Sequence, residues 1–105
     1  MTKEQLKAYR SIKRELSELK ALMRETERLD LDELRLLYVN KCNELTDALR
    51  KIEQAIETLE PTERTLMRLR YIEGRHWQDI CLRIHYSWSQ THRLHAQALL
   101  NIKNL

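Results

Sequence analysis

The stretch that decides the fold is residues 61–103, which read PTERTLMRLRYIEGRHWQDICLRIHYSWSQTHRLHAQALLNIK. The only proline of the chain, Pro61, opens this stretch, and the first turn of a helix tolerates proline because its N–H would have no partner there. The only glycine, Gly74, follows an apolar stripe, where a left-handed residue commonly ends a helix. The stretch therefore predicts three short helices separated by two tight turns.

The apolar residues of these helices recur at helical spacing. The predicted inward positions are Leu66, Leu69 and Ile72, then Trp77, Ile80, Cys81 and Ile84, then Thr91, Leu94, Ala98 and Ile102. Ser87 and Gln90 have the spacing of a capping box, which predicts a turn over 85–87 and a helix after it. The outer face of that helix is expected to carry Trp88, Ser89, His92, Arg93 and Ala96. A short helix, a three-residue turn and a longer helix in this order are typical of a helix-turn-helix, whose second helix can enter the DNA major groove.

Residues 59–99, LEPTERTLMRLRYIEGRHWQDICLRIHYSWSQTHRLHAQAL, resemble region four of sigma-70-family transcription factors, the part that binds promoter DNA. The matching features are Leu59 with Pro61, Glu63-Arg64, Leu69-Arg70-Tyr71, Gly74, Trp77, Asp79-Ile80, Ser87 and Ala98-Leu99. The whole chain resembles small phage-encoded regulators of the ArpU and RinA type, which implies a sigma-like regulator encoded by a phage or prophage. Typical region-four recognition helices carry several Arg or Lys where this chain has Trp88, Ser89, Gln90 and His92. The resemblance therefore implies the fold but no DNA sequence.

Residues 1–60 carry two apolar seams that are typical of long, coiled-coil-like helices. The first seam is Tyr9, Ile12, Leu16, Leu19 and Met23, and the second is Tyr38, Cys42, Leu45, Leu49, Ile52, Ile56 and Leu59. Thr2 and Gln5 offer a capping box for the first helix, and Asp30 offers a new helix start after a bend near residues 29–32. The seams fit an antiparallel hairpin within the chain or pairing with a second copy, so a homodimer through these helices stays open.

The predicted fold class is all-α, with a long-helix, coiled-coil-like hairpin over residues 1–60 and a helix-turn-helix domain over 61–105 that is similar to sigma factor region four. A break is expected at Glu60, because the residue before a proline is pushed out of the α region. Residues 61–105 contain seven Lys and Arg and three acidic residues, a formal charge of +4, whereas residues 1–60 have a formal charge of −1. This segregation fits a polyanion-binding module joined to an interaction module.

The sequence argues against several other classes of protein. No apolar run reaches the roughly 18 residues of a membrane span, and the N-terminus lacks the apolar core of a signal peptide, so a cytoplasmic protein is expected. Cys42 and Cys81 are expected to be reduced core thiols. The four histidines are interpreted as surface and turn residues, and no CxxC pair exists, so no metal site is expected. No catalytic or phosphate-loop motif is found, so we expect neither an enzyme nor a cofactor.

The candidate DNA-contacting residues lie on the last predicted helix and around the one before it. Arg93 is the first candidate for a base contact, because a guanidinium pairs bidentately with guanine O6 and N7. The alternative is that Arg93 is a solvated surface arginine. Gln90 can read adenine or stay occupied as a cap. Trp88 can pack on a thymine methyl or a sugar, fold back on Tyr86 or meet a protein partner. The other candidates are Ser89 and His92 for bases or phosphate, and Arg75, His76 and Arg83 for phosphates, while Trp77 is expected in the core.

Two functions fit these observations. The first is a sequence-specific DNA-binding transcriptional regulator, whose partner is double-stranded DNA and whose N-terminal helices dimerise or contact RNA polymerase. The second is a helical protein-interaction adaptor, such as an anti-activator or a sigma-binding module, which keeps the helix-turn-helix shape but does not read DNA. The basic excess of residues 61–105 and the resemblance support the regulator, and in the adaptor the thinly basic last helix would meet protein instead of DNA. The sequence leaves open the DNA target, activation or repression, and contact with polymerase.

Overall fold

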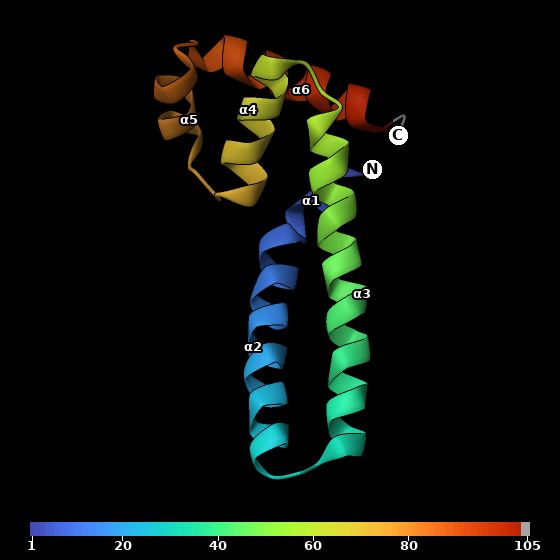
Figure 1. The fold of residues 1–105 in the computed structure, drawn as a ribbon. Helices are drawn as coiled ribbons and strands as arrows, with labels where there is room; N and C mark the ends of the chain where they lie inside the picture. Colours follow the sequence, from blue (N-terminus) through green and yellow to red (C-terminus); the bar gives the residue numbers. More distant parts are fainter. Residues whose placement is uncertain (104–105) are drawn as a thin grey trace.

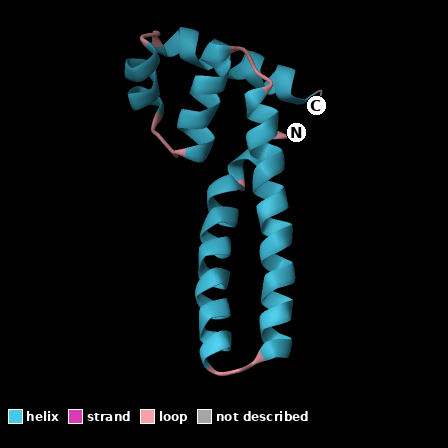
Figure 2. Cartoon of the chain, in the orientation of Figure 1, coloured by secondary structure: helices cyan, strands magenta, loops and turns pink. Residues whose placement is uncertain are grey.

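The computed structural model describes residues 1–103, which form six α-helices, one π-helical turn and no strand (Figure 2). The helices are α1 (Lys3–Lys7), α2 (Tyr9–Arg28), α3 (Asp32–Glu57), α4 (Pro61–Met67), α5 (Trp77–Ile84) and α6 (Trp88–Lys103), and the π-helical turn η1 (Arg68–Ile72) follows α4. Helices α2 and α3 form a long hairpin, and the shorter helices gather at one end of it (Figure 1). The prediction of an all-α chain with a long hairpin followed by shorter C-terminal helices is confirmed.

The two predicted seams close the hairpin within a single chain. Tyr9 and Leu16 of α2 and Cys42, Leu45 and Leu49 of α3 are each at most 9% exposed. Complete burial of an aliphatic side chain contributes about 1.5–3 kcal/mol, so a seam of this length is a large part of the stability of a small domain. Of the two arrangements that the sequence left open, the structure has the pairing of α2 with α3 inside one chain.

The hairpin turn lies where the bend was expected, but Asp30 does not start the next helix. Asp30 has a φ of 57°, a left-handed conformation that aspartate tolerates better than most residues. Leu31 stands at the N-cap of α3 and makes no side-chain capping hydrogen bond. The predicted start at Asp30 is therefore wrong. Asp32 and Glu33 in the first turn of α3 complement the helix dipole instead.

The first helix has the predicted capping box and then breaks at Ala8. Gln5 N donates to Thr2 Oγ1 at 3.2 Å, and Thr2 N donates to Gln5 Oε1 at 2.8 Å. The sequence predicted one continuous helix here, but α1 ends at Lys7 and α2 begins at Tyr9. Helix α1 lies against the C-terminal helices, and its Leu6 is completely buried.

One buried cluster connects the hairpin to the C-terminal helices. Its completely buried members are Leu6, Ile56, Leu66, Met67, Ile80, Ala98 and Ile102, which come from α1, α3, α4, α5 and α6. Polar contacts add to it, since Glu57 at the end of α3 is ion-paired with Arg64 and Arg68. The buried Glu63 of α4 accepts two hydrogen bonds of 3.0 Å from Asn101 Nδ2 of α6. Helix α6 is thereby held across α4.

The chain breaks before Pro61, as the proline predicted, and the residues after it form α4 and η1. This break coincides with the expected boundary between residues 1–60 and 61–105; the division into two domains stays a prediction, and its last two residues lie outside the described part of the chain. The π turn was not predicted. Glu73 N donates to Arg68 O at 3.0 Å, a step of five residues, and this register leaves Tyr71 buried and Ile72 half-buried.

Candidate nucleic-acid interface

Helices α5 and α6 are joined by a tight turn of three residues. His85 ends α5 with a φ of 60° and a ψ of 36°, which is the left-handed conformation that reverses the chain after a helix. Gln90 N donates to Ser87 Oγ at 3.1 Å, and Ser87 N donates to Gln90 Oε1 at 3.0 Å, so the predicted capping box is present. The amide oxygen of Gln90 is therefore occupied with the backbone, and its side-chain NH₂ remains for outward contacts.

The inner side of α6 is fixed by burial. The inward positions predicted for this helix are all buried or half-buried. His95 is also buried, at 8% exposure, so the prediction that all four histidines are surface or turn residues is wrong for this one. The reason is periodicity, because His95 follows Thr91 by four residues and precedes Ala98 by three, which puts it on the buried stripe.

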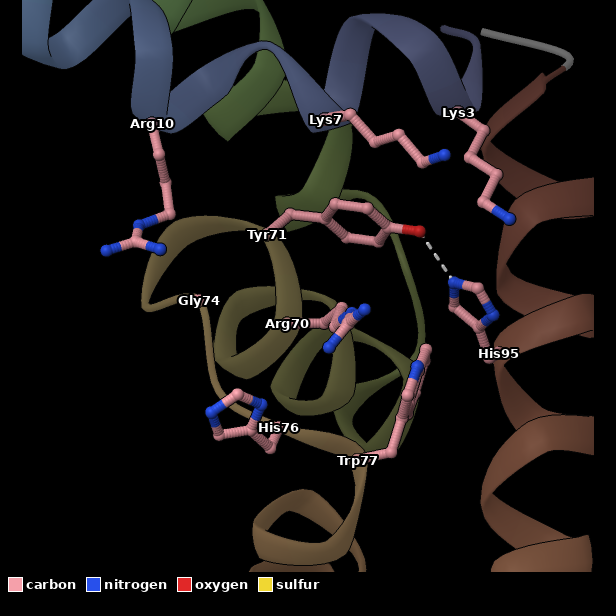
Figure 3. Close-up of a pocket in the computed structure, with 9 residues that line it drawn as sticks. All are labelled: Lys3, Lys7, Arg10, Arg70, Tyr71, Gly74, His76, Trp77 and His95. Atoms are coloured by element: carbon pink, nitrogen blue, oxygen red, sulfur yellow. Dashed lines mark hydrogen bonds between the residues drawn. The ribbon is translucent and has the colours of Figure 1, made fainter.

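Two aromatic residues enclose the His95 ring. The hydroxyl of Tyr71 lies 2.7 Å from His95 Nε2, and the centroid of Trp77 lies 4.7 Å from that of His95 (Figure 3). Burial lowers the pKa of His95 to about 4, and the positive charge of Lys3 adds to the effect. Burial also raises the pKa of Tyr71. At neutral pH the imidazole is therefore uncharged, and its Nε2 forms a hydrogen bond with the Tyr71 hydroxyl.

The opposite side of α6 is open. Trp88 is 52% exposed, and Ser89, Gln90 and Arg93 are exposed with it. Arg93 makes no ion pair with any residue in the range 1–103. Since an unpaired guanidinium keeps all five donors for a ligand, Arg93 is the candidate whose chemistry the fold leaves most accessible.

His92 lies at the border between the two sides of α6. It is half-buried, with its ring 4.6 Å from the Trp77 ring and 4.4 Å from the Trp88 ring, centroid to centroid. His92 Nε2 is buried and has no hydrogen-bond partner within residues 1–103. The expectation that His92 lies fully on the outer face is therefore wrong, because its half-buried ring packs between the rings of Trp77 and Trp88. Of the interpretations offered for Trp88, packing on Tyr86 gives way to packing on His92.

The predicted phosphate contacts around α5 are partly neutralised. Arg83 Nε donates to both carboxylate oxygens of Asp79 at 3.1 Å, and Arg75 is ion-paired with Asp79 at 3.5 Å and with Glu73 at 3.2 Å. His76 is exposed just before α5. Ion pairs at a surface contribute only about 0.2–1 kcal/mol each, so a phosphate can compete for these arginines.

Some surface features near α6 were not predicted from the sequence. Lys3, Lys7 and Arg10 lie near Arg70 and the start of α5 (Figure 3). The steps of four and three residues between the first three put them on one side of a helix, a signal that was available in the sequence. The approach of Arg70 depends on how the N-terminal helices pack near η1, which contacts α2, so no local pattern indicates it.

Three further features of the described residues concern metal ligands, membrane-spanning helices and cysteines. Within residues 1–103, no cluster of three or more His, Cys, Asp or Glu is arranged to hold a metal ion. None of the helices in this range is long and apolar enough to cross a membrane. Cys42 is buried, Cys81 is half-buried, and both are free thiols.

The enclosed His95 predicts a specific pH dependence of stability. Its pKa is about 4 in the folded chain against an ordinary 6.5, so the unfolded chain takes up the proton first as the pH falls. The contribution of the neutral His95 ring to the free energy of unfolding is therefore fully present above pH 6.5 and is lost as the pH falls toward 4. We expect acidification from pH 7 to 5 to lower the unfolding free energy by about 2 kcal/mol more in the wild type than in His95→Gln.

Urea unfolding at several pH values measures this difference. Glutamine is the matched replacement because its amide oxygen can still accept a hydrogen bond from the Tyr71 hydroxyl. The other titratable groups are common to both proteins, so their contributions cancel in the comparison. Parallel stability curves for the two proteins between pH 7 and 5 would contradict the assignment of a buried, neutral imidazole at this position.

No protein-family model, no curated protein and no solved structure matches this chain. The resemblance to sigma factor region four therefore rests on the residues and motifs quoted from the sequence.

Proposed function

We propose that this chain is a sequence-specific DNA-binding transcriptional regulator in which α5, the turn after it and α6 act as a helix-turn-helix similar to sigma factor region four. The observation that carries the proposal is the exposed, unpaired Arg93 on the side of α6 that faces away from the core. Arg93 lies two residues from Thr91 and two from His95, both of which are buried. Because residues two apart in a helix point about 200° apart, Arg93 points away from the core. The resemblance to phage regulators of the ArpU and RinA type suggests a phage or prophage origin.

In the proposed complex, the N-terminal half of α6 lies in the major groove. Arg93 pairs with guanine O6 and N7, and the free NH₂ of Gln90 donates to a base acceptor. Ser89 contacts a phosphate or a base edge near the helix N-terminus, where backbone N–H groups favour anions. Trp88, held by His92, packs on a thymine methyl or a sugar.

Phosphate contacts supply most of the affinity in this proposal. Arg75, His76 and Arg83 lie around α5, the helix that crosses the DNA backbone in helix-turn-helix proteins. Each phosphate that is neutralised releases counterions, so binding weakens as the salt concentration rises. A single module of this size binds weakly, and a second copy or RNA polymerase would add avidity.

A homodimer or a contact with RNA polymerase needs a surface other than the two seams, because these are closed within the chain. The tip of the hairpin, which lies far from α6, offers one (Figure 1). Its exposed leucines are Leu29 at 51%, Leu31 at 43%, Leu34 at 39%, Leu36 at 61% and Leu37 at 65%. Both partners stay predictions, and this tip is where we expect them to bind.

A second candidate function is the protein-interaction adaptor. The observation that favours it is three exposed apolar side chains close in sequence between α5 and the start of α6: Leu82 is 75% exposed, Tyr86 38% and Trp88 52%. Exposed apolar side chains that gather in one place often mark a protein interface. In this alternative the front of α6 meets another protein, such as a sigma factor, and no DNA is read.

Replacement of Arg93 separates the two candidates. Arg93→Ala should weaken binding to a preferred duplex by about 1–3 kcal/mol, because a bidentate contact with guanine is lost. The matched control is Arg14→Ala, which removes the same charge from an exposed position on the hairpin. Fluorescence anisotropy, with duplexes selected from the source genome and titrated at several salt concentrations, measures both effects. Binding that is indifferent to salt and to Arg93→Ala would favour the adaptor.

Weaker ion pairing of the two arginines around α5 should strengthen DNA binding. Asp79→Asn removes the carboxylate that pairs with Arg83 and Arg75, so Arg83 becomes available to phosphates and Arg75 keeps only its pair with Glu73. We expect severalfold tighter binding of duplexes of any sequence and a steeper salt dependence, by roughly one unit in log–log slope for each phosphate gained.

Asp47→Asn is the control for this change, because Asp47 pairs with Arg50 on the hairpin and its loss changes the net charge equally. The same titrations at several salt concentrations measure it. If both variants tighten binding alike, the gain comes from net charge alone and the role given to Arg75 and Arg83 is refuted.

A further inference from the structure

A cavity of about 450 Å³ lies between the N-terminal part of the chain and the C-terminal helices (Figure 3). Lys3, Lys7 and Arg10 line it from α1 and the start of α2, and Arg70 lines it from η1. In Figure 3, Lys3 and Lys7 point from α1 toward the side where His95 of α6 lies. The lining contains no carboxylate, so the cavity is a concentration of positive charge.

None of these four basic residues is ion-paired within residues 1–103, whereas Arg64, Arg68, Arg75 and Arg83 nearby all are. Like charges held together repel one another, and the repulsion increases where water is partly excluded. An anion in the cavity would remove this repulsion and gain charge-assisted hydrogen bonds. The cavity therefore has the electrostatics of an anion site.

One of the two guanidiniums is held in place before any ligand arrives. Arg70 Nη1 donates to the backbone oxygen of Arg75 at 3.0 Å, and the Arg70 guanidinium lies 4.6 Å from the centre of the Trp77 ring. A guanidinium held in this way loses less entropy on binding. The Arg10 guanidinium lies against Gly74, but Arg10 is exposed and its flexible side chain can shift. Gly74 has a φ of 69°, and this turn is the reason for glycine here.

The base of the cavity is the buried pair of Tyr71 and His95. After burial, Lys3, His92 and Arg70 are the charges that lower the pKa of His95, and burial and the Glu4 carboxylate raise the pKa of Tyr71 against the effect of Arg70. The cavity faces a different side of α6 from Arg93, because His95 points about 200° around the helix from that residue. The two sites meet at His76, which is a candidate phosphate contact and also lines the cavity.

We propose that this cavity binds a small molecule that carries two or more phosphate groups, such as the diphosphate or triphosphate part of a nucleotide. Two arginines suit the oxygens of phosphate groups, and two lysines add point charges at the rim. The volume exceeds what a single phosphate fills and lies within the usual range of small-molecule sites, about 300–1,000 Å³. Since α1 provides one wall and η1 and α6 the others, the ligand connects the N-terminal helices to α6.

Isothermal titration calorimetry of the full chain with sodium pyrophosphate, ATP and inorganic phosphate tests this site. We expect pyrophosphate and ATP to bind at least about tenfold more tightly than phosphate, because they reach both arginines and both lysines. Lys3→Gln/Lys7→Gln should weaken pyrophosphate binding by roughly tenfold. The matched control is Lys20→Gln/Lys51→Gln, which removes two exposed charges elsewhere and should change binding by less than about twofold. Equal losses in the two variants, or no binding of pyrophosphate and ATP by the wild type, would overturn the proposal.

Two further readouts place the ligand in the cavity. Saturating pyrophosphate should raise the pKa of His95 in an NMR titration, because an anion offsets the charge of Lys3 and Arg70; an unchanged pKa would contradict the location.

A duplex at constant ionic strength should leave pyrophosphate bound. Displacement of pyrophosphate by the duplex would show that the cavity takes the DNA backbone instead. The calorimetry and the His95 titration involve no DNA, so the proposed function can fail while this site stands.

Discussion

The burial of one side of α6 against the end of the hairpin and against α4 is the contact on which the rest of the molecule depends. Ala98 and Ile102 are completely buried in the same cluster as Leu6 and Ile56, which come from the N-terminal helices. Each such side chain contributes about 1.5–3 kcal/mol, whereas a surface ion pair contributes at most about 1 kcal/mol. Apolar burial, and not the surface charges, therefore decides how α6 is rotated and which residues it presents.

This rotation separates two chemistries on one helix. Arg93 is on the open side, and His95 is on the enclosed side, where it forms the base of the cationic cavity. A row of rings lies between them, since Trp77 contacts both Arg70 and His92, and His92 contacts Trp88. A ligand in the cavity and a partner at the front of α6 would therefore touch opposite ends of one packed group of side chains.

Local patterns in the sequence predicted much of this fold. The seams, both capping boxes, the left-handed Gly74 and the break before Pro61 each depend on residues that are close in sequence, and the structure has all of them. The start of α3 was placed wrongly, because Asp30 was read as a cap although it turns the chain. The π turn at η1 was missed because no local pattern in residues 68–72 indicates it, and η1 packs against α2, which is distant in sequence.

The candidate sites were harder to predict, because they depend on which helices meet. The exposure of Trp88, Ser89, Gln90 and Arg93 follows from the period of α6, and the sequence predicted it. The helical period of α6 also predicts the burial of His95, but a histidine was interpreted as a surface residue because histidine is polar. The cavity joins Lys3 to Arg70 across more than sixty residues of chain, roughly the length of the hairpin and its connections, so it could be found only in the folded structure.

Chemical-shift mapping by NMR of the full chain with a duplex at low salt tests the central claim most directly. We expect the largest changes on Trp88, Ser89, Gln90 and Arg93, on the open side of α6, with smaller changes around Arg75 and Arg83. Changes confined to the leucines at the hairpin tip, or no changes at any duplex concentration, would contradict it.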